Sequence, residues 1–258
     1  MNQRPLRSAL AASAFAALSL AAAACTATSP AAQTAAETPQ APTTDTPTAP
    51  VPEPALTRAP RDPALDPQLL RAAAADDAAT VRELIARGAD IETRGDHERT
   101  PLIAATKNRA AAAAQALIGA GADVNAKDDL QDSAYLYAGA EGLDDILEMT
   151  LRHGADLRSM NRYGGTALIP ASEHGYLATV RRLIKAGVDV NHINTPRWTA
   201  LHEAIVYGDG SERYQQVVTT LLDAGADPSI RDGAGRTVLD NAQRSGQTAI
   251  VSILRGRP

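Results

Sequence analysis

A glycine-alanine-aspartate tripeptide recurs along this chain at a nearly constant spacing. Its five copies, one with valine in the middle, occupy residues 88–90, 121–123, 154–156, 187–189 and 225–227. The first four copies follow one another at intervals of 33 residues, and the fifth follows after 38. A fixed period of this length is typical of a solenoid, in which each repeat packs mainly against its neighbours.

A second motif keeps the same register and predicts where helices begin and end. It runs from Thr100 to Ala105 in one unit, and related segments start at Ser133, Thr166, Thr199 and Thr237. A threonine or serine there can cap the free N–H groups of a helix start, and Pro101 suits the first helical position. The glycine of the tripeptide can take the left-handed conformation that ends a second helix. Each unit is therefore expected to contain a pair of helices.

Together the two motifs resemble the ankyrin repeat, which has a T-P-L-H-x-A helix start and a G-A-D-V-N helix exit. Residues 199–204 and 121–125 match those patterns nearly letter for letter. The resemblance covers residues 62–258 and implies an all-α solenoid of about six helix-pair repeats with finger turns. The repeats are expected to begin near residues 62, 95, 128, 161, 194 and 232.

The first 24 residues have the layout of a secretory signal peptide. Arg4 and Arg7 precede an alanine- and leucine-rich run, and Cys25 follows it directly. The stretch resembles a bacterial lipoprotein signal, which implies that Cys25 carries a lipid, although Ala22 stands where the lipoprotein pattern has leucine. The alternatives are ordinary cleavage that leaves a secreted protein, or a cytoplasmic ankyrin scaffold if residues 1–24 are not a signal. We expect an exported protein in the periplasm or cell envelope, anchored to a membrane.

Residues 25–61 are rich in proline, threonine and alanine and have no helical period. A segment with so few large apolar side chains cannot bury enough surface to fold, so a disordered linker is predicted. It would act as a tether that keeps the repeats near a membrane surface. A flexible leader without a spacing role is the alternative.

Composition disfavours several classes of function. The formal net charge is −5 and no basic run occurs in the repeats, so nucleic acid is not an expected partner. The five histidines lack the spacing of a zinc site, and no phosphate-binding or nucleophile motif is present. We therefore expect no cofactor, no metal and no enzymatic activity, and a monomeric protein.

In ankyrin arrays the fingertips and the exposed sides of the first helices form a concave binding face, and the resemblance carries those positions over to this sequence. Several large apolar residues occupy them in the third to fifth units, where a polar surface is the default. Trp198 is the only tryptophan of the chain. Aromatic residues, methionine and arginine are common anchors of protein interfaces. The predicted partner-binding residues are Leu130, Tyr137, Met160, Arg162, Tyr163, Ile193, Arg197, Trp198, Val206 and Tyr207.

A competing interpretation assigns Trp198 to local packing, because Arg197 replaces the glycine that is usual at that turn. Two functions therefore stay open. The first is an interaction module that binds a protein or peptide on its concave face, for example to protect, inhibit or hold an envelope protein. The second is a tethered structural spacer without a dedicated ligand.

Four further positions give specific structural expectations. Tyr135 takes a leucine position of the repeat and is predicted to lie in the core. His202 is expected to form structural hydrogen bonds between loops. Pro170 removes a backbone hydrogen bond and should bend its helix locally. The five extra residues of the fifth unit, 209–213, are assigned to the turn between its two helices.

Overall fold

The computed structural model describes residues 59–256, and every regular element in that range is helical. Two short 3₁₀ turns lie at Pro63–Leu65 and Asp96–Glu98. The α-helices are α1 (Asp66–Ala74), α2 (Ala78–Ala86), α3 (Pro101–Lys107), α4 (Ala111–Gly119), α5 (Ala134–Ala140), α6 (Asp144–Arg152), α7 (Leu168–Glu173), α8 (Leu177–Ala186), α9 (Ala200–Val206), α10 (Glu212–Asp223), α11 (Val238–Arg244) and α12 (Thr248–Arg255). They form the predicted six pairs.

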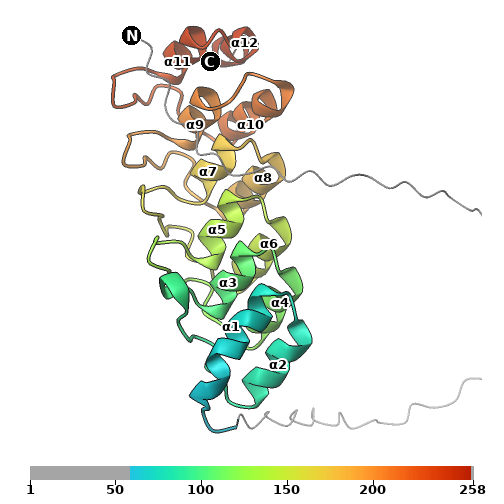
Figure 1. The fold of residues 1–258 in the computed structure, drawn as a ribbon. Helices are drawn as coiled ribbons and strands as arrows, with labels where there is room; N and C mark the ends of the chain where they lie inside the picture. Colours follow the sequence, from blue (N-terminus) through green and yellow to red (C-terminus); the bar gives the residue numbers. More distant parts are fainter. Residues whose placement is uncertain (1–58, 257–258) are drawn as a thin grey trace, which may run out of the picture. The chain divides into compact units, whose positions relative to one another are not determined.

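The helices stack in chain order as two parallel rows (Figure 1). Each odd-numbered helix packs against the next odd-numbered helix, and each even-numbered helix against the next even-numbered one. Extended loops, here called fingers, project beside the odd-numbered row and join one pair to the next (Figure 1). This is the arrangement that the 33-residue period predicts.

Four of the first helices begin with a serine or threonine cap where the second motif predicts, whereas α7 has no side-chain cap and the buried hydroxyl of Thr166 has no partner in residues 59–256. Thr100 accepts a hydrogen bond from the N–H of Ile103, and Ser133 accepts one from Leu136. Thr199 and Thr237 cap α9 and α11, each as part of a two-way capping box. Each cap provides a partner for an N–H that the helix itself leaves free.

The core lies between the two rows and is built from the apolar positions of every unit. Leu69, Leu102, Leu147, Leu183 and Leu221 are all fully or almost fully buried. Such residues recur in each pair, so the apolar interior is continuous along the described units. Stability is therefore expected to come from interfaces between neighbours.

Tyr135 confirms the expectation that it occupies a core position, because its side chain is completely buried on α5. Its hydroxyl finds no hydrogen-bond partner among the described residues. Burial raises the pKa of this phenol well above its usual range. The leucine position is therefore filled by a larger side chain with an unsatisfied polar end.

Pro170 alters the start of α7 in a way that can be traced to one hydrogen bond. In α5 the N–H of Tyr137 donates to the carbonyl of Ser133 at 2.9 Å. Pro170 stands at the equivalent place and has no N–H, so Ile169 donates to Thr166 at 3.2 Å instead. As a result α7 has six residues where α3, α5, α9 and α11 have seven. The effect seen in the hydrogen bonds is a shortened first turn, and the local bend of the helix stays a prediction.

The five extra residues of the fifth unit are shared between a turn and a helix. The sequence assigns 209–213 wholly to the turn, but Glu212 and Arg213 form the first turn of α10. Asp209 accepts a hydrogen bond from the N–H of Ser211 at 2.9 Å, which orders the approach to the helix. The insertion therefore lengthens α10 to 12 residues, and the assignment to the turn alone is wrong.

The predicted signal peptide 1–24, the lipid site Cys25 and most of the linker 25–61 lie outside the described residues. Within residues 59–256, none of the helices combines the length and apolar character that crossing a membrane requires.

Candidate interaction face

The fingers owe their shape to a recurring aspartate or asparagine at their base. Asp128 accepts hydrogen bonds from the backbone N–H groups of Leu130 and Asp132, at 3.0 and 2.9 Å. Asn161 and Asp232 each accept two such bonds from their own fingers, and Asn194 accepts one. These side chains satisfy backbone donors that the tight turn would otherwise leave unpaired. The repeat spacing marks these four positions, but nothing in the sequence pattern alone predicts this role for them.

Neighbouring fingers are joined by hydrogen bonds at their bases and tips. The N–H of Asp129 donates to the carbonyl of His97 at 3.1 Å, and that of Thr195 donates to Tyr163 at 2.9 Å. Two long side chains add similar links between the first three units. Arg94 donates to the carbonyl of Lys127 at 2.7 Å, and Lys127 donates to that of Met160 at 2.7 Å. These bonds fix the positions of the fingers relative to one another.

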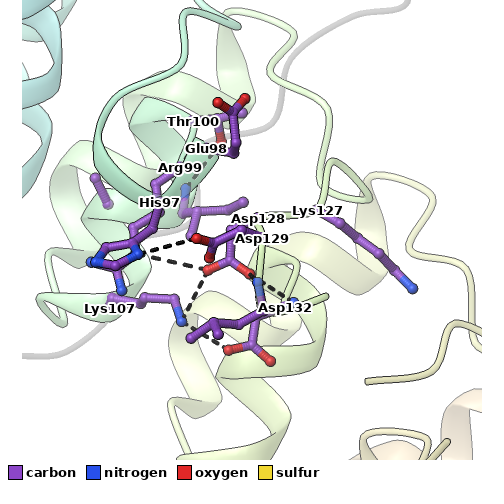
Figure 2. A network of polar contacts seen from close by, with 12 residues as sticks. His97, Glu98, Arg99, Thr100, Lys107, Lys127, Asp128, Asp129 and Asp132 are labelled. Carbon is purple, nitrogen blue, oxygen red and sulfur yellow. Dashed lines mark hydrogen bonds and ion pairs between the residues drawn. The ribbon is translucent and has the colours of Figure 1, made fainter. Parts of the chain in front are cut away.

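The finger of the third unit, which begins at Asp128, is held by a charge network (Figure 2). Lys107, at the end of α3, places its ammonium 3.2 Å from buried Asp128 and 2.8 Å from Asp132. The same ammonium lies 4.5 Å from the centre of the Tyr137 ring. His97 and Asp129 meet at 3.1 Å nearer the fingertips. The buried carboxylate of Asp128 thus has a cation from its own chain.

The large apolar side chains that are most exposed in residues 59–256 all belong to the predicted set. They are Leu130, Met160, Tyr163, Ile193 and Tyr207. Tyr163 is 55% exposed at a fingertip and Tyr207 is 48% exposed at the end of α9. All five lie on fingers or at the end of a first helix in the third to fifth units, so the exposed apolar surface is concentrated on one side of the middle of the array.

Trp198 is half-buried at the base of the fifth finger. Its ring meets that of Tyr207 edge-on, with centroids 5.6 Å apart, so part of its surface is used in local packing. Its backbone N–H donates to Asn194 at 2.8 Å. Arg197, just before it, takes a φ of 63° and is exposed, as the missing glycine predicts. Local packing and an exposed edge therefore coexist at Trp198.

The remaining predicted residues are less prominent. Tyr137 and Val206 are half-buried, on α5 and α9 respectively. Arg162 is exposed and its guanidinium stacks 4.7 Å from the ring centre of Tyr163. That contact presents a charged group next to an exposed aromatic face.

A buried carboxyl group that the sequence reasoning did not single out lies behind this surface. Glu203 on α9 is only 5% exposed, and one of its oxygens accepts a hydrogen bond from the amide of Asn194 at 3.0 Å. Its other oxygen, Oε2, has no partner among the described residues. Burial raises the pKa of Glu203 to about 8, and the nearby charge of Glu173 adds to the rise. Burial also raises the pKa of Glu173.

His202 is buried and bonds within the start of its own helix, whereas the expected hydrogen bond between loops is not among its contacts, because its Nε2 has no hydrogen-bond partner in residues 59–256. Its Nδ1 lies 3.0 Å from the hydroxyl of Thr199 and closes the capping box of α9. Burial lowers the pKa of His202, while the charge of Asp232 and the backbone of Arg236 in the next finger oppose that effect. Within the described part of the chain, no three histidine, cysteine or acidic side chains gather closely enough to hold a metal ion.

Comparison with known proteins gives the family. A family model for three ankyrin repeats matches residues 134–232, and a single-repeat model matches residues 97–129. A solved ankyrin repeat domain from Acinetobacter baumannii is 52% identical, with a TM-score of 0.71, and the match covers 73% of this chain and 96% of that one. The chain belongs to the ankyrin-repeat family. This relative comes from a bacterium, which agrees with a bacterial origin of the chain.

Two further solved ankyrin-repeat structures are similar. The ankyrin repeat protein EF0377 is 40% identical, with a TM-score of 0.71 and coverage of 74% of this chain and 97% of that one. The ankyrin repeat domain of Bcl-3, a member of the IkappaB family, is 27% identical, with a TM-score of 0.65 and coverage of 73% and 81%. No curated protein sequence matches the chain. Ankyrin repeats are protein interaction modules and are generally not catalytic.

Proposed function

We propose that this ankyrin array binds a protein or peptide on the finger side of its third to fifth units. The surface concerned, called the finger-side patch, consists of Leu130, Met160, Tyr163, Ile193, Trp198 and Tyr207. The single observation that carries the proposal is that the five most exposed large apolar side chains of the described residues gather in this patch. Exposed apolar surface of this kind is costly in water and is typical of binding sites.

The composition of the patch also favours a protein partner. Tyrosine and tryptophan provide large contact areas with few rotatable bonds and are common energetic anchors. Methionine is a flexible side chain that is enriched at protein interfaces. Arg162 and Arg197 lie exposed at its rim, where they can meet carboxylates of a partner. Fingers that are already joined by hydrogen bonds lose little conformational freedom on binding.

Crosslinked affinity capture from the source organism tests this proposal. The wild type is compared with the double variant Tyr163→Ala, Trp198→Ala. A matched control is Arg181→Ala, Gln216→Ala, in which both positions are exposed on the even-numbered helix row. We expect a specific partner that is retained by the control and lost by the patch variant. Equal capture by all three proteins would contradict the proposal and favour the structural spacer.

The location of the protein forms a separate part of the proposal. The layout of residues 1–25 supports export and a lipid on Cys25, which would anchor a monomeric array to a membrane of the cell envelope. Cell fractionation of wild type and Cys25→Ser is the test. We expect the wild type with the membranes and the variant in the soluble exported fraction. Wild-type protein in the cytoplasm would overturn this part and leave a cytoplasmic scaffold.

A further inference from the structure

Two acidic side chains lie beside the finger-side patch, and neither is paired with a lysine or arginine of residues 59–256. Glu203 is buried on α9, and Glu173 is half-buried at the end of the adjacent helix α7. The charge of Glu173 adds to the rise of the pKa of Glu203, whereas the adjacent His174 lowers the pKa of Glu173. In residues 59–256 neither carboxylate forms an ion pair, and Oε2 of Glu203 also lacks a hydrogen bond. A buried acid without a counter-ion is costly to keep.

Equivalent finger bases in other units do receive a cation from the chain itself. In the third unit Lys107 lies 3.2 Å from buried Asp128. In the sixth unit Arg236 lies 3.1 Å from buried Asp232. The equivalent finger base of the fifth unit is Asn194, which is neutral, and its amide donates to Glu203 on α9. In the repeat register, Glu173 and Trp198 stand here at the positions of Lys107 and Arg236, so neither position supplies a cation to Glu203.

Aromatic rings flank the acidic pair on the side of the patch. Tyr207 follows Glu203 by one helical turn, so the two residues lie on the same face of the helix end. Burial raises the pKa of Tyr207, and the charges of Glu203 and Glu173 add to that rise. Trp198 packs edge-on against Tyr207. Tyr214 binds the carbonyl of Glu173 through its hydroxyl at 2.9 Å and holds the end of α7 in place. Two carboxyl groups next to aromatic faces match the chemistry of a guanidinium group, which pairs with acids and stacks on rings.

We infer that Glu173 and Glu203, with Tyr207 and Trp198 beside them, receive an arginine side chain of the partner protein. The inference rests on the proposed function and names the chemistry that this patch recognises. Glu173 is the outer group that the guanidinium meets first, and Glu203 lies behind it. The chain itself shows the same stacking geometry, because Arg162 lies over Tyr163 and Arg213 over Tyr214 at 4.7 and 5.0 Å.

A pentapeptide with a central arginine and capped ends is the probe, and the same peptide with citrulline is its neutral counterpart. The only tryptophan of the chain is Trp198, so selectively excited tryptophan fluorescence of the full chain reports on this place. We expect a saturable change with the arginine peptide and none with the citrulline peptide. Glu173→Gln should weaken binding by about tenfold or more, which corresponds to about 1.4 kcal/mol. Glu203→Gln should do the same at pH 9, where Glu203 is ionised.

The control Glu212→Gln changes an exposed acid of the same unit and should bind the arginine peptide as the wild type does. Equal binding of the citrulline peptide, or full binding by the Glu173→Gln, Glu203→Gln double variant, would overturn the inference. If the tryptophan fluorescence changes with protein concentration in the absence of peptide, a second copy of the chain occupies the site. That result would also overturn the inference.

Partner capture with the same variants separates this inference from the proposed function. If the two glutamine variants and the Tyr163→Ala, Trp198→Ala variant all lose the partner, both statements are supported. If only the aromatic variant loses it, the patch binds a partner and the arginine inference is wrong. If none loses it, the proposed function itself is wrong.

Discussion

At the scale of single residues, the carboxyl group of Glu203 stands out because its surroundings disfavour the charged form. Glu203 is almost completely buried, has one hydrogen bond from Asn194, and faces a second acid, Glu173. Sequence periodicity could not reveal this, because a glutamate at that place of the repeat is unremarkable until its neighbours are known. Glu203 is unusual because the neighbouring helix supplies no cation to it, whereas Lys107 supplies one to Asp128.

The pH dependence of stability should report on Glu203. Its pKa is about 8 in the folded protein against an ordinary value of 4.5. Between these two values the folded protein holds a proton that the unfolded chain releases, so the free energy of unfolding falls as pH rises through this window. Glu203→Gln cannot ionise and should escape the loss. Denaturant unfolding at pH 5 and pH 8 should show the variant gaining roughly 2 to 4 kcal/mol relative to wild type over that interval.

The exposed variant Glu212→Gln is the control and should follow the wild type at both pH values. A constant difference between Glu203→Gln and wild type at pH 5 and pH 8 would mean that Glu203 is ionised throughout, and would contradict the description given for this side chain.

At the scale of elements, helix starts depend on whether a side chain reaches the free N–H groups. Ser133 caps α5 and is fully buried, with a 3.1 Å bond from the N–H of Leu136. Ser211 holds the same position before α10 but makes no such bond. The sequence predicted the caps of α3, α5, α9 and α11, whereas Thr166 at the same repeat position does not cap α7. It misassigned the 209–213 insertion, because nothing in the local letters shows that Glu212 and Arg213 join the helix.

Two serine substitutions should therefore differ in effect. Ser133→Ala removes a cap and is expected to cost about 1 kcal/mol of the free energy of unfolding. Ser211→Ala removes no hydrogen bond at the helix start and should change stability by less than about 0.5 kcal/mol. Thermal and denaturant unfolding of both variants is the measurement. Equal losses would show that the cap geometry of α5 has no energetic role.

At the scale of the whole described array, stability and binding are assigned to different surfaces. The core between the helix rows was predictable from the apolar positions of the repeat, and Leu183 and Tyr135 lie in it as expected. Exposure of the patch was predictable too, because large apolar residues at finger positions have no core to enter. The acidic pair was not predictable, since it depends on two helices from different repeats meeting at one place.

This division gives a contrast between two leucines. Leu183→Ala deletes a fully buried side chain in α8 and should cost roughly 2 to 5 kcal/mol. Leu130→Ala changes an exposed fingertip and should cost less than about 1 kcal/mol. Denaturant unfolding of both variants is the check. A loss from Leu130→Ala as large as that from Leu183→Ala would show that the fingertip is a packing element rather than a free surface.

The central claim is that the finger side of the middle units meets a protein partner, and site-specific photocrosslinking in the source organism tests it most directly. A photoreactive amino acid is placed at Tyr163 or, as a control within the same unit, at exposed Arg181 on α8. The account predicts a discrete crosslinked protein from position 163 and none from position 181. A crosslink from position 181 alone, or none from either position, would contradict it.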